Sequence, residues 1–163
     1  MLMKKIMKKV LVELLKDSKK SDRKLAELVG VSQPTVTRTR SRLVKEGVIK
    51  EFTVIPDLPK MGFEILAINC FRSRVTKELA DKARKVAMAN PNIIFSARCQ
   101  GEGKNGMIIS LHKNYTDYSK FITNIISEGG DDIQEHETFL ISLNDFIAKP
   151  FSLKYIAELI EKQ

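Results

Sequence analysis

The chain has 163 residues, of which 43% are hydrophobic and 29% are charged, and its formal net charge at pH 7 is +8. This composition is typical of an ordinary folded protein with enough apolar residues for one large core or two small ones. No apolar run approaches the ~20 residues that a membrane span needs, and no secretion signal is recognisable, so we expect a cytoplasmic protein without a membrane partner.

The excess positive charge is confined to the first third of the chain. Residues 1–55 hold 14 Lys and Arg against 6 Asp and Glu, whereas residues 56–163 hold 14 of each kind. A basic segment followed by a neutral one is the electrostatic pattern of a nucleic-acid-binding domain joined to a domain with another role. A solvated lysine-rich surface is the alternative interpretation of the same charge.

The first two helices are predicted from apolar spacing and capping residues. Apolar side chains recur at steps of three and four over residues 2–17, which indicates an amphipathic helix. Ser21 or Asp22 can cap a second helix. That helix is expected to end at Gly30, where a left-handed backbone conformation is needed and glycine adopts it freely.

A third helix and a strand are predicted next. Ser32 can cap the helix, Pro34 suits its first turn, and Gly47 ends it. Residues 48–55 are β-branched and aromatic, and Pro56 ends them, so they are predicted to form a strand. Three helices and one strand indicate a winged helix-turn-helix domain.

The rest of the chain predicts a second domain of different architecture. Helices are expected over residues 76–89 and from Asn114 to Gly129, between strands at 63–71, 93–100, 107–112 and 133–143. The order strand-helix-strand-strand-helix-strand is that of a ferredoxin-like βαββαβ domain, so the fold class is α+β. The predicted divisions are the winged domain at 1–56, a linker at 57–62, and 63–163 including a closing helix at 153–161.

The exposed face of the third helix is predicted to bind DNA. With Val36 taken as the inward direction and a step of 100° per residue, Leu43 also faces the core, and hydroxyl and cationic side chains face outward. Arginine can bond guanine through two hydrogen bonds, and threonine can contact a thymine methyl group. The candidate residues are Ser32, Gln33, Thr35, Thr37, Arg38, Ser41, Arg42, Lys45 and, on the predicted wing, Lys50. Contact with phosphates or water alone is the alternative for this face.

Arg40 departs from the pattern of this helix. It projects toward the core side, where an apolar residue is expected. Its side chain would have to extend along the helix surface or pair with a carboxylate such as Glu27.

The combination of these elements resembles the Lrp/AsnC, or feast/famine, family of regulators over nearly the whole chain. LAELVGVS followed by TVTRTRSRLVKEGVIKEF resembles the family's helix-turn-helix and wing, and KMGF at residues 60–63 resembles the entry into its effector domain. The matching positions are Gly30, Ser32, Arg42, Leu43, Gly47, Ile49 and Thr138.

This resemblance implies a homodimer or higher homo-oligomer that binds double-stranded promoter DNA. It also implies second domains that pair through their sheets and an amino acid bound between subunits. The family's hairpin carries a Gly-x-x-Asp-like turn, and this chain has a glycine-rich segment, 101–106, with Asn105 roughly where the Asp falls. The residues expected to bind an effector are Gly101, Glu102 and Asn105. A flexible hairpin without a ligand is the alternative.

No catalytic residue, metal site or cofactor is predicted. His112 and His136 are in no ligand spacing with a cysteine. Cys70 and Cys99 are far apart in the sequence, and without a secretion signal we expect them to be reduced core thiols. We therefore expect no enzyme but a sequence-specific DNA-binding transcription regulator, with an amino acid or another small metabolite as its candidate effector. The alternatives are a tetrapyrrole-binding enzyme, because siroheme decarboxylases resemble the same architecture, and a stand-alone ligand-binding or scaffold protein.

Overall fold

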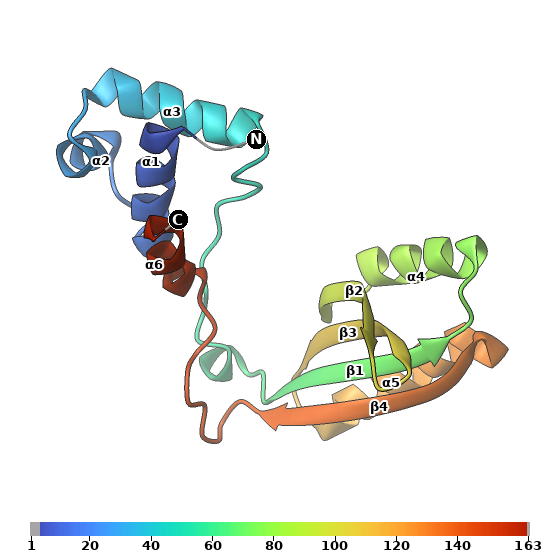
Figure 1. The fold of residues 1–163 in the computed structure, drawn as a ribbon. Coiled ribbons are helices and arrows are strands. Elements are labelled where there is room, and N and C mark those ends of the chain that lie inside the picture. The colour runs from blue at the N-terminus through green and yellow to red at the C-terminus, as the bar shows by residue number, and fades with distance from the viewer. Residues whose placement is uncertain (1–3, 163) are drawn as a thin grey trace. The chain divides into compact units, whose positions relative to one another are not determined.

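The computed structural model describes residues 4–162, and these form two compact units (Figure 1). The helical unit contains the chain up to Ile55 together with the segment from Lys149 onward, and the sheet unit contains Pro56–Ala148. No helix in the described part of the chain is long and apolar enough to cross a membrane.

The helical unit is built on three helices, as predicted. They are α1 (Lys5–Lys16), α2 (Asp22–Val29) and α3 (Gln33–Lys45). The Ser21 hydroxyl caps α2 by accepting a hydrogen bond from the Lys24 amide at 3.2 Å, and Gly30 ends α2 with φ of 76°. Their shared core contains Met7, Val10, Leu14, Leu25, Ala26, Val29, Val36 and Leu43.

Ser32 precedes α3 as predicted, but its side chain does not cap the helix. Its hydroxyl instead forms a hydrogen bond with the Thr35 hydroxyl at 2.8 Å. Pro34 lies in the first turn of α3, where a missing amide hydrogen is tolerated.

The strand predicted over residues 48–55 is absent, so that prediction was wrong. The amides of Val48 and Ile49 both donate to the Leu43 carbonyl, at 2.9 and 3.0 Å, and the chain then continues in an irregular conformation. Ile49 packs against the core of the helical unit. β-branched residues form a strand only beside a partner, and no segment within residues 4–162 supplies one here.

The predicted closing helix exists but was assigned to the wrong domain. A 3-10 turn at Leu153–Tyr155 leads into α6 (Ile156–Glu161), which lies against α1 in the helical unit. Ala157 of α6 is buried, and Lys16 Nζ lies 2.7 Å from Glu161 Oε1. The apolar side of so short a helix can be buried by either unit, so its periodicity did not identify its partner.

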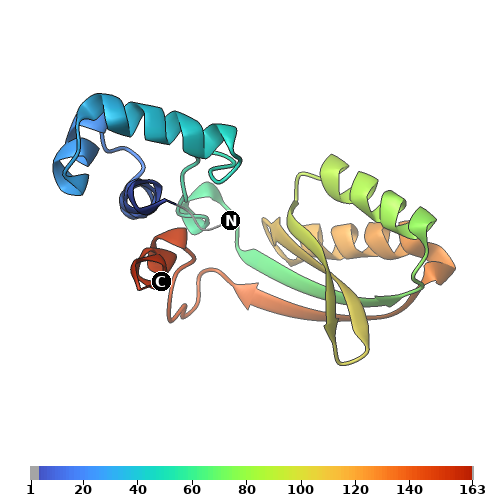
Figure 2. The same ribbon diagram turned by 45° about the horizontal axis from the view of Figure 1, so that its top comes forward.

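The sheet unit has the predicted ferredoxin-like topology. In chain order it contains β1 (Ile65–Ser73), α4 (Lys77–Ala89), β2 (Ile93–Gly101), β3 (Lys104–His112), α5 (Tyr115–Gly129) and β4 (Ile133–Ser142). The antiparallel sheet has the order β2-β3-β1-β4, with α4 and α5 on one face (Figure 2). The predicted linker residues 57–62 form part of this unit, with a 3-10 turn at Pro59–Met61.

The core of the sheet unit lies between β1, β3 and α5. Ala67 and Phe71 of β1 pack against Tyr118, Phe121 and Ile125 of α5. A hydrogen-bonded group sits at its centre: the Tyr118 hydroxyl lies 3.1 Å from Asn69 Oδ1 and 2.9 Å from the Thr138 hydroxyl. These bonds allow polar side chains to be buried beside apolar ones.

The two histidines occupy unrelated positions. His112 is fully buried, with Nε2 2.9 Å from the Ser110 hydroxyl and its ring 4.8 Å from that of Phe121. Burial lowers the pKa of His112, which favours the neutral imidazole. His136 is exposed on β4, so the two imidazoles do not share a ligand site.

The sheet face opposite α4 and α5 is apolar and uncovered within residues 4–162. Asn69 faces α5, so the alternation of the strand directs Ile68 to the other face. Strand register places Ile68 beside Ile109 on one side and Phe139 on the other, and Ile109 beside Phe95. Phe95 and Phe139 remain 49% and 59% exposed. We call these four residues the apolar row.

Candidate nucleic-acid interface and ligand site

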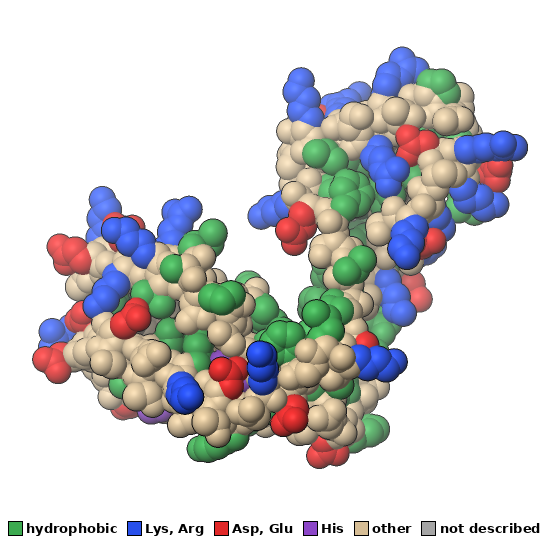
Figure 3. All heavy atoms as spheres, turned by 180° about the vertical axis from the view of Figure 1, so that it is seen from behind, with side chains coloured by type: hydrophobic (Ala, Val, Ile, Leu, Met, Phe, Trp, Pro, Cys, Tyr) green, Lys and Arg blue, Asp and Glu red, His purple; other side chains and the backbone are tan. Residues whose placement is uncertain are grey.

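The outer face of α3 carries cationic and hydroxyl side chains, as predicted. Val36 and Leu43 are fully buried, and the candidate residues are exposed except for the half-buried Thr35. In the space-filling view, many Lys and Arg side chains project from the helical unit among fewer Asp and Glu side chains, and both signs of charge are mixed on the sheet unit (Figure 3). The helical unit holds 17 Lys and Arg against 8 Asp and Glu, and the sheet unit holds 11 against 12.

Two of the candidate side chains are engaged by carboxylates of the helical unit itself. The Thr37 hydroxyl donates to Asp22 Oδ2 at 2.7 Å, and Arg42 Nε donates to Glu46 Oε1 at 2.6 Å. A phosphate would have to compete with Glu46 for the Arg42 guanidinium. These two residues are therefore less available to DNA than the sequence indicated.

The other cations of the α3 face are available. Arg38 Nε donates to the Pro34 carbonyl at 3.2 Å, which holds the side chain along its own helix, while its terminal nitrogens pair with no carboxylate in the described part of the chain. Lys45 and Lys50 are exposed and likewise form no ion pair among residues 4–162. Gln33 and Ser41 are exposed on the same helix.

Lys4 and Lys5 extend this cationic surface, a role that the sequence did not indicate. A shallow depression of about 400 Å³ brings them together with Arg38, Thr39 and Arg42. The amphipathic pattern of α1 predicted its apolar side but not the helix to which its N-terminus lies close. Four cations around one depression form a positive region suited to a phosphate group.

Arg40 joins three parts of the helical unit. Its Nη1 lies 2.9 Å from Asp22 Oδ1, and its Nη2 donates to the Ser18 carbonyl at 3.2 Å. Its guanidinium carbon lies 5.2 Å from the centre of the Phe52 ring. The expected pairing with a carboxylate is confirmed, but the partner is Asp22 and not Glu27. The Arg40 side chain crosses from α3 to α2 and holds both the loop before α2 and the segment after α3.

We expect Arg40→Ala to lower the free energy of unfolding by about 1.5–3 kcal/mol, the range for hydrogen bonds to charged groups. The side chains of Arg40 and Asp22 are only 28% and 19% exposed, so water replaces the lost bonds poorly. Urea unfolding of Arg40→Ala, Asp22→Ala and the double variant would measure the coupling between them.

Arg23→Ala is the matched control for this cycle. The Arg23 side chain is 84% exposed and lies 3.8 Å from Glu27, so its loss should change stability by less than about 0.5 kcal/mol. Equal effects of Arg40→Ala and Arg23→Ala would contradict a structural role for Arg40.

The hairpin between β2 and β3 is tighter than predicted. Only Glu102 and Gly103 form the turn, with φ of 46° and 71°, the two positive values of a type I′ turn. The predicted turn over 101–106 was therefore wrong, because the last three residues belong to β3. Glycine at 106 misled the prediction, since glycine also occurs within strands.

The side-chain amide of Asn105 is bonded to Ser73. Its Oδ1 accepts from the amide and hydroxyl of Ser73 at 3.0 and 3.1 Å, and its Nδ2 donates to the Ser73 carbonyl at 2.7 Å. Gly101, beside the turn, and Glu102, within it, are both exposed. Asn105 thus ties β3 to the end of β1, and Glu102 is the predicted effector residue whose side chain remains accessible.

Lys104 is also engaged. Its side chain is 7% exposed and lies 3.0 Å from Glu135 and 3.1 Å from Glu137. Hydrogen bonds to these two carboxylates raise the pKa of Lys104, so the amine stays protonated. Within residues 4–162, no group of three His, Cys, Asp or Glu side chains is placed to hold a metal ion.

Comparison with known proteins identifies the helical unit. A family model described as winged helix-turn-helix DNA-binding matches residues 3–50. An uncharacterised HTH-type transcriptional regulator of Pyrococcus abyssi is 38% identical over 108 residues, which cover 63% of this chain and 70% of that protein. The regulator LrpC of Bacillus subtilis is 31% identical over 93 residues, covering 56% and 62%.

Solved structures share the fold over 93% of the chain. A transcriptional regulator of Neisseria meningitidis in complex with L-Met has a TM-score of 0.80 at 14% identity, covering 93% of this chain and 94% of that one. Escherichia coli AsnC has a TM-score of 0.75 at 16% identity, covering 93% and 99%. In this chain the winged helix-turn-helix match precedes the sheet unit. The chain therefore belongs to the Lrp/AsnC family of HTH-type transcriptional regulators.

Proposed function

We propose that this regulator acts in the cytoplasm as a homo-oligomer that binds promoter DNA sequence-specifically through α3. The observation that carries the proposal is the outer face of α3, where exposed Arg38, Ser41 and Lys45 follow a helix-turn-helix. The second helix of such a motif enters the major groove, and the residues near its N-terminus contact base edges. Lys4 and Lys5, beside α3, would contact the phosphates that flank the same groove.

The apolar row supports assembly through the open sheet face. The row has one residue on each of the four strands: Phe95, Ile109, Ile68 and Phe139. Exposed aromatic rings at the centre of an apolar surface are typical of a protein contact. A second copy of the same face would cover the row and position two α3 helices on one DNA.

A single comparison tests the assembly and the DNA binding together. We expect the unaltered protein to sediment as a dimer or larger oligomer in analytical ultracentrifugation. Phe139→Glu places a carboxylate within the apolar row, so we expect this variant to sediment as a monomer. We expect the unaltered protein to protect half-sites about 10 base pairs apart, or a multiple of that distance, on a promoter fragment. Phe139→Glu should lose the paired protection.

Tyr115→Glu is the matched control, because Tyr115 is 64% exposed on α5 and away from the open sheet face. It should assemble and protect DNA as the unaltered chain does. Unchanged assembly of Phe139→Glu would refute pairing through the row. Absence of protection on every promoter fragment recovered from the source cells would refute the regulator function.

We further propose that an amino acid is sensed at the β2–β3 hairpin. The Neisseria meningitidis relative, which was solved with L-Met, supports an amino-acid effector. Glu102 offers an exposed carboxylate for an α-ammonium group, and the turn's backbone amides would take the α-carboxylate. A ligand can shift the assembly only by favouring one state over another in free energy.

We expect at least one of the twenty amino acids to raise the melting temperature of the protein. Glu102→Ala should lower the affinity for that amino acid by at least about tenfold. Calorimetry would measure the loss. Glu78→Ala, which removes an exposed carboxylate in the first turn of α4, should leave the affinity unchanged. Full binding by Glu102→Ala would move the site away from the hairpin.

A further inference from the structure

The two helices that cover the sheet pack against it very differently. α5 buries Tyr118, Phe121 and Ile125, whereas none of the thirteen residues of α4 is buried. The apolar side of α4 carries Leu79 and Val86, yet both are only half-buried. Because protein interiors are close-packed, a helix that buries none of its apolar side chains leaves space between itself and the sheet.

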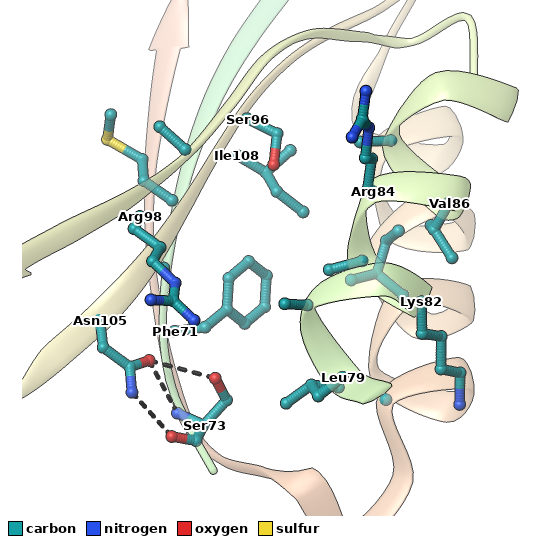
Figure 4. Close-up of a pocket in the computed structure, with 18 of the residues that line it drawn as sticks. Phe71, Ser73, Leu79, Lys82, Arg84, Val86, Ser96, Arg98, Asn105 and Ile108 are labelled. Carbon is teal, nitrogen blue, oxygen red and sulfur yellow. Dashed lines mark hydrogen bonds between the residues drawn. The ribbon is translucent and has the colours of Figure 1, made fainter. Parts of the chain in front are cut away.

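A cavity of about 610 Å³ occupies this space. Its volume is within the range of about 300–1,000 Å³ that small-molecule sites occupy in proteins. Phe71, Ser96 and Ile108 form the floor on the sheet, and Leu79 and Val86 form the wall on α4 (Figure 4). Alanines widen it on the α4 side: Ala80, Ala83 and Ala87. The lining is therefore mainly apolar, with room for a ligand chain.

The charged groups around the cavity are nearly all positive. Its lining includes four cations and, among the described residues, a single carboxylate, that of Glu128. Lys82 donates to the backbone carbonyl of Glu128, and Arg74 lies 4.0 Å from Asp132. Arg84 and Arg98 form no ion pair within residues 4–162. Two unpaired guanidiniums beside an apolar space favour an anionic ligand.

Arg98 is the better placed of the two. It extends from β2 and ends beside Phe71 (Figure 4). It pairs in register with Gly106 of β3, which has no side chain to fill the neighbouring space. A carboxylate bonded to Arg98 would leave its chain lying between Phe71 and the inner side of α4.

We propose that this cavity binds an organic acid that has an apolar chain and no α-ammonium group, with its carboxylate on Arg98. An α-amino acid would bring its ammonium group into a lining of four cations and one carboxylate, which disfavours it. The site lies within one protomer, between α4 and the sheet. It is therefore distinct from the amino-acid site proposed at the hairpin, and its ligand belongs to a different chemical class.

Sodium octanoate is a suitable probe for the DNA-free, full-length protein. We expect saturable binding by calorimetry, with an affinity at least about tenfold higher than for octan-1-ol or 2-aminooctanoate. Octan-1-ol lacks the carboxylate that would form a charge-assisted hydrogen bond with Arg98. 2-Aminooctanoate keeps the carboxylate, but its ammonium group is repelled by the cations of the lining. Equal affinities for the acid and the alcohol would overturn the role of Arg98. No saturable binding of octanoate would overturn the proposal.

Two variants locate the site. Arg98→Gln should lower the affinity for octanoate roughly tenfold and leave the affinity for octan-1-ol unchanged. The control Lys113→Gln, at an exposed position outside the lining, should change neither affinity. Ala83→Phe should fill the cavity and abolish binding of both compounds. Undiminished octanoate binding in either Arg98→Gln or Ala83→Phe would overturn the assignment. DNA affinity measured in parallel without octanoate separates such a failure from a failure of the regulator function.

Discussion

We expect the affinity of this regulator for its promoter site to fall by at least about a thousandfold when the salt concentration rises from about 50 to about 200 mM. Exposed lysines that lack carboxylate partners among the described residues are available to phosphates, namely Lys4, Lys5, Lys45 and Lys50, so a dimer presents eight such cations. Each cation that neutralises a phosphate releases condensed counterions from DNA, and added salt opposes that release. Fluorescence anisotropy across a salt series would give the slope of log affinity against log salt.

Charge-removing variants refine that measurement. Lys45→Ala should reduce the slope by about 2 for a dimer, because one phosphate contact is lost at each half-site and each contributes about 0.9. Lys113→Ala, which removes an exposed charge from the sheet unit, should leave the slope unchanged. A slope near zero in the unaltered protein would be incompatible with binding by the α3 face.

Local signals in the sequence were sufficient for most elements of the fold. Helix α2 begins after Ser21 and ends at Gly30. The side chains of Thr76 and Asn114 cap α4 and α5 by accepting hydrogen bonds from backbone amides. Such interactions span three or four residues, so the sequence alone contains them. The order of strands and helices then sufficed to predict the sheet topology.

The errors arose where structure depends on a distant partner. Residues 48–55 have strand-forming composition but no neighbouring strand within residues 4–162. Helix α6 packs on α1, where the bonded residues Lys16 and Glu161 are 145 positions apart in the sequence. The partner of Arg40 was missed for the same reason, since Asp22 and Glu27 are both on α2 and only three-dimensional geometry distinguishes them. Local periodicity contains no information about such choices.

The candidate DNA-binding face was predicted as a set of residues but not as a set of available groups. Helical periodicity identified the exposed side of α3, and burial in the structure agrees with it. The engagement of Thr37 by Asp22 and of Arg42 by Glu46 depends on side-chain conformation. These bonds leave Arg38 as the arginine of the face best able to contact a base.

Arg38→Ala should separate base recognition from attraction to phosphates. Its Nε is held by the Pro34 carbonyl at 3.2 Å, so the terminal nitrogens can point outward to the O6 and N7 atoms of a guanine. We expect the variant to lose about 1–3 kcal/mol per half-site on the specific DNA and much less on random DNA, so the gap between the two narrows.

Lys50→Ala provides the contrast. Lys50 follows the end of α3 and is exposed, so it is expected to contact phosphate and to contribute to specific and random DNA alike. Competition binding with both DNAs would measure each variant under identical salt. If Arg38→Ala and Lys50→Ala weakened both DNAs equally, the α3 face would hold the DNA backbone only, and the sequence preference would have to come from the shape of the DNA.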